Sequence, residues 1–554
     1  MLTPDSTFIA MHAFRPSRPF RFVRRLLLVG MAASMAACGG GGGGGGGSSG
    51  SSLDLSLSPR SVSTEFLEGD AEPLHATATV SVDSDFSQVP VVVVTDRGAT
   101  AVLESVQVSS TDVSTYDVNF LLRNDLPAGR YQSSFQVRIC SSASCNKVFA
   151  SETVSYVVQV NSTTHLTALA PLAGAADWTA VDGDAGEASY VPVTLDPANF
   201  SLRWRLDIPD FDPNSGNTWN PPLESVLSAD GAVFFRTSQA STVPASLLAV
   251  NEADGSVRWT HRATMELNRP VIAGDVVYTV MFPNYLHAIR GLDIATGSVV
   301  ADIPNTRGQS AALTAVDGRL VYRGSVDIYN NTGLISLDLA TQQIDWVNWF
   351  QAPVVASGNT VYTFTPESVA TAPLGGGLFA LDASTGDTTL AIADMGMEAV
   401  SPIATSLRTV IVPGAVGEVL GEDPDHVAMF DTVAGIRRWS IPSVALIGAG
   451  EGVTYVMRGA QIDALSNANG ATQWSWAPPE APWTLIDAVF TRNIAFISTL
   501  QKVYAVDMAT RAVVWTYPRA GALSISKNGV LFIMRGVKND FDRSEGVLVA
   551  VNLH

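Results

Sequence analysis

The stretch Leu248-Ala-Val-Asn-Glu-Ala-Asp-Gly-Ser-Val-Arg-Trp259 decides the fold. It reads as a short apolar strand, a tight turn and a second strand that ends in Trp. Related units end at positions 259, 300, 346, 390, 439, 474 and 515, which are spaced 35 to 49 residues apart. Self-similarity at such a period is typical of repeat architectures.

Each interval between these units holds a further strand, such as Gly274-Asp-Val-Val-Tyr278. Four strands in about forty residues is the size of a propeller blade. The ends of the repeat region supply an eighth unit, because Ser201-Leu-Arg-Trp204 lacks a first half and Val547-Leu-Val-Ala-Val-Asn552 lacks a Trp strand. The sequence therefore predicts an all-β protein with an eight-bladed propeller, closed by strands from both ends so that no sheet edge stays free there.

The repeat form Ala-x-Thr-Gly-x-x-x-Trp resembles that of pyrroloquinoline-quinone (PQQ) propellers. Trp178-Thr-Ala-Val-Asp-Gly-Asp184 and Leu195-Asp-Pro-Ala-Asn-Phe-Ser-Leu-Arg-Trp204 are similar to the opening segment of that family. The resemblance covers roughly residues 175–554. A WD40 propeller is disfavoured, since no Gly-His and Trp-Asp pairing recurs.

The resemblance implies a structural role for the repeat tryptophans, which pack between neighbouring blades in that family. Val300 and Leu390 stand where other units have Trp, so those blades lose an aromatic anchor. The expected structural tryptophans are Trp204, Trp259, Trp346, Trp439, Trp474 and Trp515.

Residues 53–160 read as a separate domain. Alternating runs such as Tyr131-Gln-Ser-Ser-Phe-Gln-Val-Arg-Ile139 follow one another at short intervals, which predicts an immunoglobulin-like β-sandwich of about seven strands. Tyr131 opens its strand in a form similar to bacterial Ig-like domains, where the tyrosine hydroxyl bonds nearby backbone. Residues 161–177 are then a linker, and the propeller spans 178–554.

Cys140 and Cys145 lie in what reads as a hairpin tip of this domain. A structural disulfide is the preferred interpretation in an oxidising compartment. A redox-active pair is the alternative, but nothing nearby would depress a thiol pKa.

The N-terminus reads as an export signal. Five Arg precede the apolar run Leu26-Leu-Leu-Val-Gly-Met-Ala-Ala33, which is too short to span a bilayer. Met35-Ala-Ala-Cys38 then resembles the lipobox of bacterial lipoproteins. This predicts a signal peptide over 1–37, lipidation of Cys38 and a Gly/Ser tether over 38–52. Gly39 after the cysteine implies the cell outer membrane, with the periplasmic or surface face open. An ordinary signal peptide is the alternative.

Several function classes find no support in the sequence. A net charge of −19 opposes nucleic-acid binding. No pair among the seven His has zinc-ligand spacing. PQQ alcohol dehydrogenases carry adjacent cysteines beside their cofactor, whereas residues 178–554 contain no cysteine. We therefore expect no cofactor, no metal and no catalysis.

The chain also resembles the lipoproteins of the outer-membrane β-barrel assembly machinery, which are scaffolds with a PQQ-like eight-bladed propeller. This implies a lipid-anchored cell-envelope binding or scaffold protein with an envelope protein as partner. The additional β-sandwich and poly-Gly tether leave a barrel-assembly role in doubt. A PQQ-dependent oxidoreductase and a surface module that binds glycan or protein are the alternatives.

Partner binding would use loops at one face of the propeller. Candidate anchors are the aromatic residues of three segments, and two insertions are further candidates. The alternative for the aromatics is that they fill gaps between blades. The segments are Met281-Phe-Pro-Asn-Tyr285, Trp349-Phe350 and Trp474-Ser-Trp-Ala-Pro-Pro-Glu-Ala-Pro-Trp483, and the insertions are 365–377 and 413–426.

Overall fold

The computed structural model of the chain is built from strands, and no α-helix occurs in the described residues. It forms two compact units, Met1–Leu166 and Thr167–His554. The residues described are 7–10, 53–71, 73–82, 91–111, 114–164, 166–208, 226–237, 245–263, 267–281, 287–305, 312–326, 332–350, 353–365, 377–393, 398–399, 403–406, 409–415, 425–442, 444–480, 483–535 and 546–554.

Those residues of the first unit that the structure describes form two sheets. One has the strand order β2-β4-β7-β6, with bounds Leu53–Ser58, Leu74–Val82, Thr115–Leu122 and Leu103–Ser110. The other has the order β1-β5-β8-β9-β3, with bounds Thr7–Ala10, Val91–Asp96, Gly129–Cys140, Val148–Asn161 and Ser61–Leu67. Strand β1 lies inside the predicted signal peptide and pairs antiparallel with β5.

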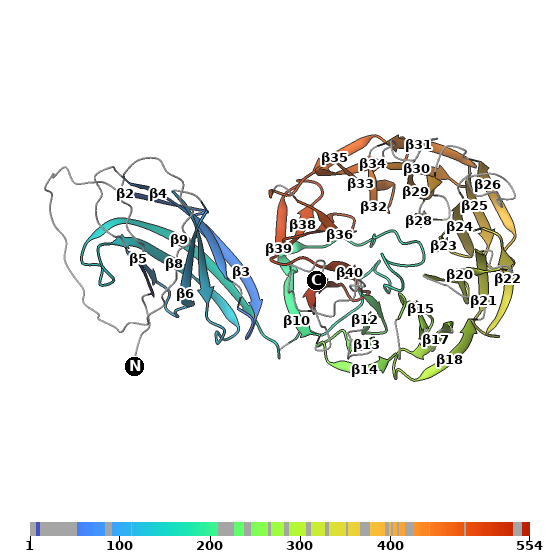
Figure 1. Ribbon diagram of the computed structural model, residues 1–554, viewed down its shortest axis with the longest axis horizontal. Coiled ribbons are helices and arrows are strands. Elements are labelled where there is room, and N and C mark those ends of the chain that lie inside the picture. Colours follow the sequence, from blue (N-terminus) through green and yellow to red (C-terminus); the bar gives the residue numbers. More distant parts are fainter. Residues whose placement is uncertain are drawn as a thin grey trace, which may run out of the picture. The chain divides into compact units, whose positions relative to one another are not determined.

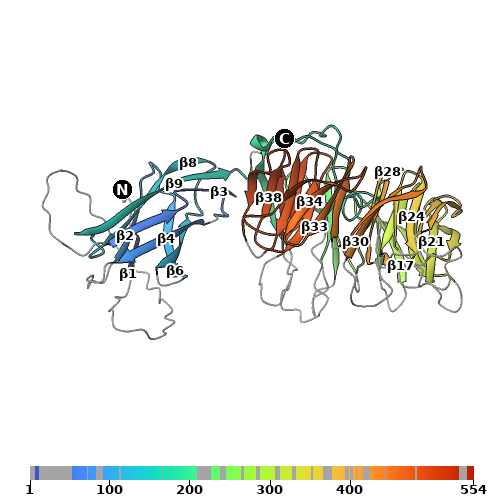
Figure 2. The same cartoon turned by 90° about the horizontal axis from the view of Figure 1, so that it is seen from above.

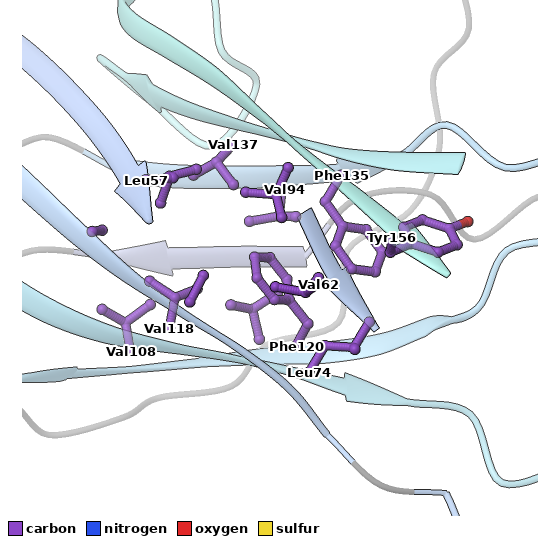
Figure 3. Packing of buried hydrophobic residues seen from close by; sticks show 14 of the residues in the cluster. Leu57, Val62, Leu74, Val94, Val108, Val118, Phe120, Phe135, Val137 and Tyr156 are labelled. Atoms are coloured by element: carbon purple, nitrogen blue, oxygen red, sulfur yellow. The ribbon is translucent and has the colours of Figure 1, made fainter. Parts of the chain in front are cut away.

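Alternating side chains build the core between these two sheets. Along β2 every second residue is buried, as expected for a strand with one face in a core. The rings of Phe120, Phe135 and Tyr156 stack in the middle, with centroids 4.6 and 4.5 Å apart (Figure 3). Strands β2 to β9 make eight in the predicted sandwich, one more than expected. The assignment to the immunoglobulin-like class stays a prediction.

The described residues of the second unit form eight sheets, which we number as blades 1 to 8. Blade 1 is β11–β14 (Leu227–Ala229, Ala232–Arg236, Ser246–Asn251, Val257–Arg262), blade 2 is β15–β18 (Val271–Ala273, Val276–Met281, His287–Asp293, Val299–Asn305), and blade 3 is β19–β22 (Leu313–Val316, Arg319–Ser325, Thr332–Asp338, Gln343–Asn348). Blade 4 is β23–β26 (Val354–Ser357, Thr360–Thr365, Gly377–Asp382, Thr388–Ala393), and blade 5 is β27–β31 (Glu398–Ala399, Ile403–Ser406, Thr409–Ala415, Asp425–Asp431, Ile436–Pro442). Blade 6 is β32–β35 (Ala445–Gly450, Val453–Arg458, Gln461–Ser466, Thr472–Trp476), and blade 7 is β36–β39 (Leu485–Phe490, Ile494–Thr499, Val503–Asp507, Val513–Tyr517).

Blade 8 joins both ends of the repeat region. It pairs β10 (Ser201–Asp207) with β42 (Val547–Asn552), followed by β41 (Val530–Arg535) and β40 (Ala522–Ile525). The antiparallel register runs from Ser201 opposite Asn552 to Asp207 opposite Val547. The predicted eighth unit, completed from two orphan halves, is therefore confirmed, and the blades form a closed ring (Figure 1).

Burial differs between the strands of a blade. Neighbouring blades cover both faces of the middle strands, whereas the outermost strand is partly open to solvent. The third strands, such as Ser246–Asn251 and Gly377–Asp382, are buried at nearly every position. The fourth strands lie outermost and expose much of their length, as Val257–Arg262 does. First strands of adjacent blades contact one another from blade 1 to blade 8 and line the inside of the ring. Figure 2 shows the blades edge-on.

Candidate functional site

The repeat tryptophans form a contact that links consecutive blades. Trp346, in the last strand of blade 3, donates from Nε1 to the carbonyl oxygen of Ala383 in blade 4 at 2.9 Å. Its ring covers Gly386, where an added Cβ would lie 2.6 Å from Cδ2 of the indole. The same pair of contacts is made by Trp204 with Glu252 and Gly255, by Trp259 with Ile294 and Gly297, and by Trp439 with Asn467 and Gly470.

The other blade junctions depart from this contact. At the junction of blades 4 and 5, a Cβ added at Gly435 would lie 3.9 Å from Cδ1 of Leu390, so the leucine makes no close contact with this glycine. The turns of blades 3 and 7 carry Gln342 and Arg511 at the left-handed position that is glycine elsewhere. Val300, which precedes blade 3, is 49% exposed. Trp474, which precedes blade 7, lies beside the ring of Tyr455, and Trp515 meets the ring of Phe200 edge-on at 6.2 Å.

Two buried charged side chains fasten the closing blade to blade 1. Arg203 in β10 donates to the carbonyl oxygens of Ala253 and Thr167 at 2.8 and 2.9 Å, and to Oδ1 of Asn552 at 2.9 Å. Glu252 in the blade 1 turn accepts from Ser526 and, at 2.8 Å, from Nδ2 of Asn528. Burial raises the pKa of Glu252. Sequence inspection missed both residues because neither type is characteristic of the repeat.

Residues 172–195, which we call the belt, pass around the inside of the ring before the chain enters β10 (Figure 1). The belt meets the blades in their spatial order. Its backbone is hydrogen-bonded to Lys527 in blade 8, Ser228 in blade 1, Ile272 in blade 2, Ala356 in blade 4, Ala449 in blade 6, and Phe490 and Arg492 in blade 7. Belt side chains also enter the packing between blades, including Ala180, Ala185 and Tyr190. The belt thereby satisfies backbone N–H groups on inner strands that have no strand neighbour on that side.

Charged side chains gather along the belt. Burial raises the pKa of Glu187 to about 8, and the charge of Asp182 adds to this shift. Burial and Asp182 likewise raise the pKa of Asp487, in β36, to about 8. The pKa of Asp182 itself is raised by burial and lowered by Arg269. All three carboxyl residues keep partial solvent exposure although protein surrounds them closely. None was identified as a site residue from the sequence, although Asp182 lies in the segment similar to the PQQ family.

The carboxyl residues along the belt are not arranged as a metal-binding group. Within the part of the chain that the structure describes, no group of three or more His, Cys, Asp or Glu side chains is placed to hold a metal ion. The inside of the ring presents Asp182, Glu187 and Asp487 against Arg269.

The predicted contact aromatics divide into buried and exposed residues. Phe350 is buried and packs on Phe379 with ring centroids 4.6 Å apart. Trp476 is also buried, and Trp483 donates to the carbonyl oxygen of Ala460 at 3.0 Å. Trp349 remains 45% exposed, where β22 ends. Of the other candidates, residues 282–286, 366–376 and 416–424 lie outside the described residues.

The first unit contains the predicted cysteine pair and tyrosine contact. A disulfide joins Cys140 and Cys145. Tyr131 donates its hydroxyl to the carbonyl oxygen of Pro127 at 2.7 Å, which confirms the predicted bond to nearby backbone. Cys38 and the tether lie outside the described residues. Among the residues described, no helix has the length and apolar character needed to cross a membrane.

Comparison with known proteins identifies the type of propeller. A sequence model of the family described as outer membrane protein assembly factor BamB matches residues 193–391. This match, together with the eight blades, makes the second unit a PQQ-like β-propeller. No curated protein matches the chain.

Similar solved structures include BamB from Moraxella catarrhalis, which is 12% identical, covers 64% of this chain and 97% of its own, and gives a TM-score of 0.45. A europium-containing methanol dehydrogenase is 11% identical, with coverage of 68% and 98% and a TM-score of 0.46. The computationally designed Ika8 protein is 13% identical, with coverage of 59% and 94% and a TM-score of 0.44.

Proposed function

We propose that this chain is a lipid-anchored cell-envelope protein that binds a protein partner through its PQQ-like propeller and catalyses no reaction. The observation that carries the proposal is the match of residues 193–391 to the family of an outer membrane protein assembly factor. The lipobox-like Met35-Ala-Ala-Cys38 supports the anchor and an outer-membrane location.

The end of the propeller with the longer connections is the proposed partner surface. In each antiparallel blade, the connections from second to third strand and from one blade to the next lie at the same end. The connections after β24 and β29, which contain the predicted insertions, belong to this end. Exposed Trp349 lies there too, and large aromatics are frequent anchors in protein interfaces.

A PQQ-dependent oxidoreductase is the competing proposal, because PQQ-like propellers also occur in dehydrogenases. Calorimetric titration of the purified chain with PQQ and Ca²⁺ separates the two. The binding protein gives no saturable heat, whereas saturable binding at micromolar or lower concentration would favour the enzyme.

Anchoring is tested separately in cells. Metabolic labelling with a fatty acid should mark the wild-type chain and not Cys38→Ala. Protease treatment of intact cells then distinguishes a surface-exposed binding module, which is degraded, from a protein that faces the periplasm and is protected.

A further inference from the structure

One edge of the larger sheet in the first unit is occupied by a strand that the mature protein is predicted to lose. Strand β1 pairs antiparallel with β5, from Thr7 opposite Val94 to Ala10 opposite Val91. It stands at the end of the sheet order β1-β5-β8-β9-β3, so within the described chain it pairs with β5 alone. Removal of the predicted signal peptide, residues 1–37, would leave one side of β5 without a strand neighbour.

The rest of the unit holds β5 in place without β1. On its other side, β5 pairs with β8 along its whole length. Val92 and Val94 are 5% and 1% exposed and belong to the core between the sheets. Where the strand ends, the carboxylate of Asp96 accepts from the hydroxyl of Tyr156 at 2.8 Å and from the N–H of Val102 at 2.7 Å. The edge that β1 covers is therefore a formed strand when β1 is absent.

The uncovered edge of β5 would differ from the other sheet edges of this unit. Edge strands in native proteins usually carry charged or polar side chains, which discourage pairing with another chain. In the part of the unit that the structure describes, the edge strands β2, β3 and β6 follow this rule, with exposed Asp54, Ser61 and Gln107. Strand β5 instead has valine at all of positions 91–94, on both of its faces. Such β-branched residues favour pairing with a further strand.

We propose that the mature protein uses this edge of β5 as a binding site, which takes an extended, uncharged segment of a partner protein as an added antiparallel strand. Strand β1 supports the fit, because its sequence Thr-Phe-Ile-Ala carries no charge and its backbone forms this pairing. In such strand addition, main-chain hydrogen bonds supply affinity and alternating side chains supply sequence preference. The proposal rests on the proposed cleavage before Cys38 and is independent of binding by the propeller.

Peptide binding to the mature chain tests the site. The probe is a synthetic peptide of residues 5–12 with blocked ends, added to a chain of residues 39–554, which lacks both β1 and the cysteine proposed to be lipidated. Hydrogen exchange of segment 91–96 is the readout, because an added strand protects the amides that face the free edge. At a peptide concentration about ten times Kd, these amides should be protected about tenfold more than without peptide. Exchange in β6, an edge strand of the other sheet, should not change.

N-methylated peptides separate strand pairing from general apolar adhesion. In an antiparallel pair, only alternate residues direct their N–H groups to the neighbouring strand. Methylation of the backbone nitrogen of Phe8 should therefore have the opposite outcome to methylation at Ile9, since one abolishes the added protection and the other retains it. Retention with both peptides, loss with both, or the absence of binding by the unmodified peptide would overturn the proposal.

Val93→Lys places a charge on the same edge and should reduce the added protection. Ser109→Lys, an exposed change in edge strand β6, is the matched control and should leave the protection intact. An equal effect of the two variants would contradict binding at β5. Should Val93→Lys not fold, the two methylated peptides decide the question with the unaltered chain.

Two further measurements identify what occupies the edge in the native protein. Light scattering of the 39–554 chain should give a monomer, and a dimer that Val93→Lys disperses would overturn the proposal in favour of a second copy. The intact mass of the protein purified from membranes should correspond to a chain that begins at lipidated Cys38. Retention of residues 1–37 would keep β1 on β5 and would also refute the proposal, whereas it would leave partner binding by the propeller unaffected.

Discussion

Gly386 and Trp346 form one contact across the junction of blades 3 and 4. The indole lies on the glycine so closely that a Cβ at position 386 would meet three of its ring carbons at 2.6 to 2.9 Å. Trp346 also donates to the carbonyl oxygen of Ala383, three residues before this glycine. The Gly and the Trp of the sequence repeat thus belong to neighbouring blades and act together.

Gly386→Ala should destabilise the propeller by about 2–5 kcal/mol. Roughly 1–2 kcal/mol comes from the left-handed backbone and the remainder from overpacking against the indole. Gly318→Ala is the matched control, because Gly318 has a similar φ of 70° and open space around its Cβ position. Urea unfolding should show a clearly larger loss for position 386, and equal losses would refute the contact.

Trp346→Ala should cost about 3–5 kcal/mol, since it empties a buried aromatic site and removes the bond to Ala383. Trp349→Ala, three residues away, removes a tryptophan that is 45% exposed and should change stability by about 0.5 kcal/mol or less. Thermal unfolding of the two variants measures the difference. Comparable losses would mean that Trp349 packs as a structural residue.

Arg203→Met should lower propeller stability by about 2 kcal/mol, because it removes the charge-assisted hydrogen bonds that the buried Arg203 side chain donates to Ala253 and Thr167. Arg205→Met in the same strand removes an ion pair with the exposed Asp207 side chain and should cost about 1 kcal/mol or less. Denaturant unfolding monitored by tryptophan fluorescence gives both values. A neutral Arg203→Met variant would show that the ring closes without this residue.

Replacing both Cys140 and Cys145 by Ala should destabilise the first unit by about 2 kcal/mol, as expected for a short disulfide loop. The propeller should keep its own transition, because the disulfide lies wholly within the first unit. Differential scanning calorimetry should show one shifted and one unchanged transition. A shift of both would contradict independent units.

The blade number and the ring closure were predictable because similar sequence units recur at a nearly regular spacing along the chain. Each unit ends in a turn and a strand of fixed form, and the orphan halves at Trp204 and Val547 can only complete one another. The short inner strands, such as Val271–Ala273, carry little signal of their own. The strand count of the predicted sandwich, β2 to β9, was underestimated by one because its strands follow no period.

The path of the belt was not predictable. Its contacts join residues far apart in sequence, such as Val191 and Phe490. These contacts are hydrogen bonds of the backbone, which impose no recognisable pattern on the amino-acid sequence. The same holds for Asp487, which looks like an ordinary strand residue until the fold brings it beside Asp182. The closing pair Arg203 and Glu252 likewise depends on tertiary contacts.

Photo-crosslinking in intact membranes tests the central claim most directly. A photoreactive amino acid at position 349 samples the proposed partner end, and one at exposed position 433, in the turn between β30 and β31, samples the opposite end. The account predicts a discrete adduct with an envelope protein from position 349 and none from position 433. The absence of an adduct from 349, or equal adducts from both positions, would contradict binding through this end of the propeller.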